Sequence, residues 1–173
     1  MRTNLLAVLC GLASCAAALA FQPPMPKPGP EQDKLKAFVG DWDCVVKFGD
    51  MEMKGTATYT LGFGGFWLTE TFKSDGPEKF EGRGTMGYDP NKKKYVSTWI
   101  DSESPSMMVS EGDYDKDGKT YTEIGDGPGE DGKPQKYKSA VEFKDKDTIV
   151  MTMAMVKDGK DQQVMTITYK RKK

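Results

Sequence analysis

Ten short runs of β-forming residues follow one another from Trp42 to Tyr169, and turn residues separate each run from the next. The expected strands are Trp42–Phe48, Lys54–Leu61, Trp67–Phe72, Phe80–Tyr88, Tyr95–Asp101, Met107–Tyr114, Thr120–Ile124, Tyr137–Phe143, Thr148–Val156 and Val164–Tyr169. Regular spacing of this kind predicts an all-β sandwich or barrel. Because almost every connection is short enough for a hairpin, we expect an antiparallel up-and-down β-barrel rather than a Greek key.

Side-chain alternation supports the closed barrel. In Thr148–Val156, isoleucine and three methionines alternate with valine, threonine and alanine, so one face is strongly apolar and the other is intermediate. A barrel with a partly polar lining produces this pattern. Before the strands, the spacing of Leu35, Phe38 and Val39 in Asp33–Gly40 predicts one short N-terminal helix that ends at Gly40.

Gly82, Gly84 and Gly87 form a GxGxxG pattern, the spacing of a dinucleotide-binding loop. That loop works because its glycines join a strand to a helix, whose N-terminus meets the pyrophosphate. Here the glycines lie inside an alternating run, and a turn and another β-rich run follow them. We therefore expect strand glycines that permit bending or close approach, and no nucleotide cofactor.

The first part of the chain differs from the rest. Residues 1–20 carry one early arginine, an apolar segment too short for a membrane span, and an Ala-Leu-Ala ending, as a secretory signal peptide does. A lipoprotein anchor at Cys15 is the alternative, because residues 12–15 resemble a bacterial lipobox. Residues 21–32 are proline-rich and predict an extended tether. The expected arrangement is thus signal peptide 1–20, tether 21–32 and one barrel domain 33–173, exported to the periplasm or outside the cell, with no transmembrane segment after cleavage.

Composition excludes several functions. The chain has no histidine, which rules out Ser-His-Asp and Cys-His catalysis and histidine-ligated zinc or haem. The formal charge of −1 and the absence of a central basic block give no support to a nucleic-acid partner. Cys44 would be the single cysteine after cleavage, and its apolar neighbours predict a buried structural thiol.

Two acidic patterns each have two interpretations. Asp113–Gly118 matches the start of a calcium loop, but the twelfth position holds Ile124 where a glutamate is needed, so an Asp-Gly hairpin turn is expected instead and no metal is assigned. Acidic residues inside strands, Asp101 and Glu70 among them, could form an acid–base pair, provided that two carboxylates face one cavity.

Aromatic and charged residues of the middle strands are the candidate ligand-binding residues. Trp67, Tyr88 and Trp99 would form aromatic walls, with Arg83 and Asp101 as polar anchors. Arg83 serves as an anchor only if it faces inward, and the sequence pattern leaves the strand register open.

Two resemblances bear on the fold. The segment FVGDW, residues 38–42, resembles the glycine-x-tryptophan start of lipocalins and related calycin barrels, which implies a barrel whose closed end is plugged by Trp42 and whose interior holds small apolar molecules. Across residues 31–172, the segments DKLKAFVGDWD, LGFGGFWLTE, FEGRGTMGYDPNKKKYVSTWIDS, EGDYDKDGK and VMTITYKRK resemble, in order, the bacterial family of domain of unknown function 1579. That family often has a histidine before the first helix, where this chain has residues such as Asp33. The resemblance to this second family implies the fold but no reaction or ligand.

The leading hypothesis is a non-enzymatic, exported, lipocalin-like protein that binds a small apolar or amphipathic molecule in its barrel, without a cofactor. One alternative is a carboxylate-based enzyme without histidine. The other is a cell-envelope interaction module with a packed interior and an exposed apolar patch.

Overall fold

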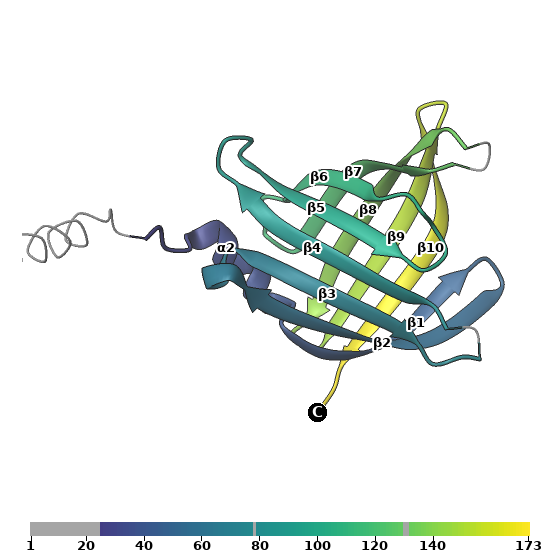
Figure 1. Ribbon diagram of the computed structural model, residues 1–173, viewed down its shortest axis with the longest axis horizontal. Helices are drawn as coiled ribbons and strands as arrows, with labels where there is room; N and C mark the ends of the chain where they lie inside the picture. The colour runs from purple at the N-terminus through teal and green to yellow at the C-terminus, as the bar shows by residue number, and fades with distance from the viewer. Residues whose placement is uncertain (1–24, 78, 130–131) are drawn as a thin grey trace, which may run out of the picture.

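The computed structural model describes residues 25–77, 79–129 and 132–173, and these form one closed antiparallel barrel (Figure 1). The strands are β1 (Gly40–Phe48), β2 (Met51–Gly62), β3 (Trp67–Ser74), β4 (Glu81–Asp89), β5 (Lys94–Asp101), β6 (Met108–Tyr114), β7 (Thr120–Pro128), β8 (Pro134–Asp145), β9 (Thr148–Lys157) and β10 (Lys160–Arg171). Each strand pairs with its neighbours in the chain, and β1 pairs with β10 to close the barrel. The predicted up-and-down barrel of ten strands with a short N-terminal helix is confirmed.

Tight turns make several strands longer than the sequence pattern predicted. Asp158 and Gly159 both have positive φ and form a two-residue turn, so pairing between β9 and β10 begins at once, with Lys160 opposite Lys157. β10 therefore starts four residues before the predicted Val164. The β6–β7 connection is the expected Asp-Gly hairpin turn, in which the Gly118 N–H donates to the Asp115 carbonyl.

A short helical segment covers one end of the barrel (Figure 1). α2 (Pro30–Lys34) continues into a 3₁₀ turn (Leu35–Ala37), and Gly40 then turns the chain into β1 with a φ of 133°. The helix begins three residues earlier than expected, because Pro30 suits the first helical turn and the Gln32 side chain accepts a hydrogen bond from the Gly29 N–H at 2.9 Å. The predicted signal peptide and the first four residues of the predicted tether lie outside the described residues.

Trp42 closes the same end from inside. Its side chain is fully buried, and its indole N–H donates to the Phe38 carbonyl at 2.8 Å. The Arg171 guanidinium lies 4.1 Å from the centre of the Trp42 ring and donates to the Ala37, Val39 and Lys146 carbonyls. The helical segment, the first strand and the last strand are thereby joined at one point. Among the described residues, no helix has the length and apolar character needed to cross a bilayer.

Candidate functional site

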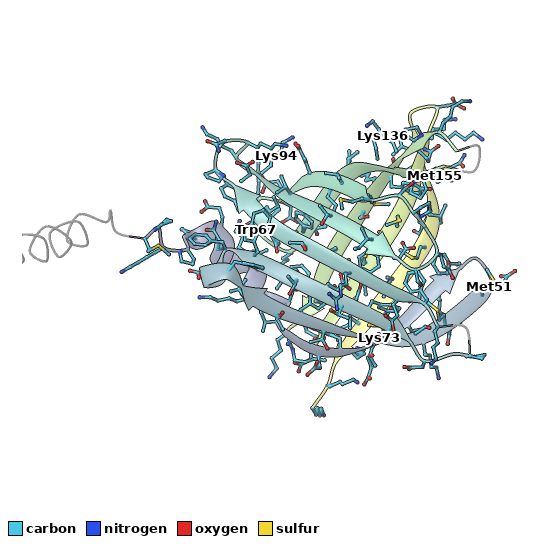
Figure 2. The ribbon with its side chains drawn as sticks, viewed as in Figure 1. Met51, Trp67, Lys73, Lys94, Lys136 and Met155 are labelled. Carbon is cyan, nitrogen blue, oxygen red and sulfur yellow. The ribbon has the colours of Figure 1, made fainter. Side chains whose placement is uncertain are left out.

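The barrel encloses a cavity of about 1160 Å³. It extends from Phe38 and Tyr59 near the helix-covered end to the opposite end, where Met51, Gly76 and Glu103 lie in or beside the hairpin loops. Figure 2 shows Met51 and Met155 at this second end, away from α2. We call this end the mouth and the region around Glu70 and Glu123 the floor. Because the interior holds a cavity of this size, the hypothesis of a fully packed interior is not supported.

Methionine dominates the apolar wall of the cavity. Eight of the eleven methionines of the chain line it. They are Met51, Met53, Met86, Met108, Met151, Met153, Met155 and Met165. Their side chains are flexible and polarisable, so such a wall adapts to apolar bodies of different shapes. Three come from β9, as the alternation of that run predicted.

Glu70, on β3, is a half-buried carboxylate at the floor of the cavity. It accepts hydrogen bonds from the hydroxyls of Tyr59 on β2 and Tyr169 on β10. Burial raises the pKa of Glu70 from 4.5 to about 7; the Tyr59 and Tyr169 hydrogen bonds oppose the shift, and the nearby charge of Glu123 adds to it. A carboxyl group with this pKa is about half ionised at neutral pH.

Glu123, on β7, is the second floor carboxylate. One of its oxygens accepts hydrogen bonds from Ser97 Oγ at 2.7 Å and from the Tyr121 hydroxyl at 2.9 Å. Burial raises the pKa of Glu123, while these two hydrogen bonds lower it. Two carboxylates therefore share one cavity, and the pKa of each is displaced upward by loss of water.

The described lining of the cavity is strongly acidic. Six carboxylates line it, and Lys54 is the one basic residue among the described lining residues. The six are Glu52, Glu70, Asp75, Asp101, Glu103 and Glu123. Lys54 belongs to the mouth, where the Asp75 N–H donates to its carbonyl. The floor carboxylates thus have hydroxyl partners and no described cation beside them.

Two of the five candidate binding residues line the cavity. Trp99 lies along the wall, and its indole N–H donates to Asp101 Oδ2 at 3.0 Å. The other Asp101 oxygen accepts from the Glu103 and Ser104 N–H groups, both at 2.9 Å, and so orders the loop after β5 at the mouth. Asp101 and Glu70 line one cavity, but it is Glu123 that joins Glu70 at the floor.

The other three candidates lie elsewhere. Arg83 is exposed on β4 between the inward-facing Gly82 and Gly84, so it points outward and is no anchor for a ligand in the barrel. Trp67 is also outside the cavity, and Figure 2 shows it near the end that α2 covers. Tyr88 belongs to a tyrosine cluster at the covered end, with its ring centre 5.2 Å from that of Tyr95. Strand alternation turns Arg83 and Trp67 outward, whereas Tyr88 faces inward and lies outside the cavity because it is near the covered end.

Two glycines of the GxGxxG pattern leave room for the rings of Trp99 and Trp67. The glycines of the pattern lie within β4, and β5 follows the turn. A Cβ atom at Gly82 would lie 2.1 Å from the Trp99 ring, and one at Gly87 would lie 2.5 Å from the Trp67 ring. Gly82 thus lets Trp99 lie flat against the inner wall, while Gly87 does the same for Trp67 outside. The predicted close approach is confirmed.

Cys44 is buried in β1, as expected for a structural thiol. Burial, with smaller contributions from Glu70 and Asp43, raises the pKa of this thiol to about 12. The group is therefore protonated and unreactive at neutral pH.

Comparison with solved structures supports the barrel fold. A crystal structure of Rv2717c from M. tuberculosis matches with a TM-score of 0.60 and 14% identity, covering 84% of this chain and 99% of that one. The S-type phycobiliprotein lyase CPES from Guillardia theta matches with a TM-score of 0.53 and 14% identity, covering 84% and 99%. At this identity the likeness shows the fold alone. No curated protein matches the chain.

The family comparison covers the whole barrel. The family described as protein of unknown function DUF1579 matches residues 27–171, from before α2 to the last residue of β10. This agrees with the order of segments seen in the sequence, and the chain therefore belongs to the DUF1579 family.

Proposed function

We propose that this protein is an exported binding protein that holds one small, partly apolar molecule inside its barrel. The observation that carries the proposal is the cavity of about 1160 Å³ with its methionine-rich wall. Ligand sites are mostly apolar hollows with a few placed polar groups, and the cavity fits that description. The S-type phycobiliprotein lyase is an example of a functional protein on the same fold. The proposal of export rests on the pattern of residues 1–20.

An acid–base enzyme is the second candidate. It is favoured by Glu70 and Glu123, two carboxylates at one floor, with the pKa of Glu70 near neutrality. Against it, the described floor offers no cation to stabilise a developing negative charge. Binding is therefore the function that the geometry supports best.

The test is titration of the purified protein with the neutral fluorescent probe N-phenyl-1-naphthylamine. We expect saturable binding of about one probe per chain, because the probe matches the apolar wall and carries no charge. Met153→Trp should weaken binding about tenfold or more, since Met153 points into the cavity and a larger ring there fills it.

Thr152→Trp is the matched control, because Thr152 lies on the outer face of the same strand. It should bind the probe as the unaltered protein does. Absence of saturable binding, or equal binding by folded Met153→Trp, would contradict the proposal.

A further inference from the structure

Carboxylates dominate the charged lining of the cavity. The described lining residues include six carboxylates and one lysine, and the lysine is at the mouth. The apolar wall lies between the acidic mouth and the acidic floor. A ligand that enters therefore meets carboxylates at both ends and apolar side chains along its length.

The floor carboxylates have no ion-pair partner among the residues that the structure describes. Tyr59 and Tyr169 donate to Glu70, while Ser97 and Tyr121 donate to Glu123. All four partners are neutral hydroxyls, so neither carboxylate has its charge compensated by them. Both carboxylates line the open cavity, where a ligand group reaches them. Buried carboxylates without a counter-ion are costly, and a cationic partner removes that cost.

We propose that Glu70 and Glu123 together form an anchor for a cationic nitrogen, so that the ligand is an amphiphile with an amine head at the floor and an apolar body along the methionine wall. This rests on the proposed binding function and names the chemical class of the ligand. An ammonium group supplies N–H donors as well as charge, and ionised acceptors make the stronger hydrogen bonds. A ligand with a carboxylate head is disfavoured, because it would place a third negative charge at the floor.

The anchor implies that binding is linked to a proton. The titratable groups facing Glu70 are Glu123 from β7, Tyr59 from β2, Tyr169 from β10 and Cys44 from β1. Burial keeps both tyrosines and the cysteine protonated at neutral pH, which leaves the two glutamates to respond. A cation at the floor favours the ionised glutamates, so it binds more tightly as the pH rises toward the range where Glu70 is already ionised.

The experiment uses three probes with the same ten-carbon tail: decylammonium, decanol and decanoate. Each competes with N-phenyl-1-naphthylamine for the purified protein at low salt. We expect decylammonium to bind about tenfold or more tightly than decanol, and decanoate to bind more weakly than decanol. The affinity for decylammonium should rise between about pH 6 and pH 8, where the amine itself stays charged, whereas that for decanol should not change.

Glu70→Gln combined with Glu123→Gln should remove most of the preference for the amine while leaving the decanol affinity within about twofold, because the amide keeps the shape and accepts from the same hydroxyls. Glu142→Gln is the matched control on the outer face of β8, where Glu142 pairs with Lys144. Glu52→Gln combined with Glu103→Gln removes charge from the mouth instead.

Four results would overturn the anchor. Equal binding of amine and alcohol, a preference that survives in the floor double variant, or a preference lost only in the mouth double variant each contradicts it while leaving the cavity a binding site. Failure of all three probes to displace the dye also overturns it and counts against the proposed function itself, so the two failures are distinguishable.

Discussion

Tyr114 and Tyr121 lie together at the covered end of the barrel, with ring centres 5.3 Å apart, but their hydroxyls differ. The Tyr121 hydroxyl donates to Glu123 at 2.9 Å. The Tyr114 hydroxyl is buried without a hydrogen-bond partner among the described residues. An unpaired buried hydroxyl loses its hydrogen bonds to water without replacement. A paired hydroxyl replaces them with a hydrogen bond inside the protein.

This difference predicts opposite effects of one small change. Tyr121→Phe should lower the free energy of unfolding by about 1–2 kcal/mol, because it leaves the half-buried Glu123 carboxylate with one donor fewer. Tyr114→Phe should leave it unchanged or raise it by up to about 1 kcal/mol. Urea unfolding of the two variants measures both effects, and an equal loss in both would contradict the assignment of partners.

At the residue scale, the sequence predicted which kinds of residue lie in the strands better than it predicted whether each side chain points into or out of the barrel. Trp99 and Asp101 were expected at the cavity and line it, while Arg83 and Trp67 were expected there and lie outside. One position of register separates an inward from an outward side chain, and the turn signals fix strand ends only to within a few residues. Glu123 was inside an expected strand, but its place in the same cavity as Glu70 depends on how the barrel closes.

At the scale of elements, Arg171 near the end of β10 holds the covered end together. It donates to the Ala37 and Val39 carbonyls on one side and to the Lys146 carbonyl on the other, and it stacks on Trp42. Trp42 in this place agrees with the plugged closed end that the glycine-x-tryptophan resemblance implied. No local pattern in the sequence marks Arg171, because its partners lie far away in the chain and most are backbone atoms.

Arg171→Ala should therefore lower the free energy of unfolding by about 2–3 kcal/mol, through loss of three hydrogen bonds and a cation–π contact. Arg171→Lys should recover only part of this, because an ammonium cannot reproduce the guanidinium fork. The neighbouring Lys172→Ala, which breaks only an exposed ion pair with Asp43, should change stability by less than about 0.5 kcal/mol. Thermal and urea unfolding of the three variants compare them directly; equal losses at both positions would contradict the role of Arg171.

The elements themselves were largely predictable, since each depends on local sequence. Asp-Gly turns and alternating runs predicted all ten strands, and Gly40 predicted where the helical segment ends. The start of α2 was missed because proline-rich sequence suggests an extended tether, whereas Pro30 occupies the first helical turn. Closure through β1 and β10 followed from strand number and alternation, but the volume left inside depends on every inward side chain at once.

At the scale of the whole molecule, closing the barrel takes Glu70 out of bulk water, which makes global stability depend on pH. Between pH 4.5 and about 7 the folded protein keeps a proton on Glu70 that the unfolded chain has lost, so stability falls as the pH rises. Below that window both states are protonated and above it both are ionised, so the effect is absent at low pH and constant at high pH. The slope is roughly 1.4 kcal/mol per pH unit within the window.

Glu70→Gln should remove this slope. Relative to the unaltered protein, its free energy of unfolding should rise by about 3 kcal/mol from the acidic to the alkaline side of the window, since the amide carries no charge to bury. The Tyr59 and Tyr169 hydroxyls still have an oxygen to donate to, so the fold is retained. Urea unfolding across that pH range measures the difference, with exposed Glu142→Gln as the control that should run parallel to the unaltered protein. A Glu70→Gln curve that also ran parallel would mean that the pKa of Glu70 is the same in the folded and the unfolded chain, and it would contradict the raised pKa of the folded state.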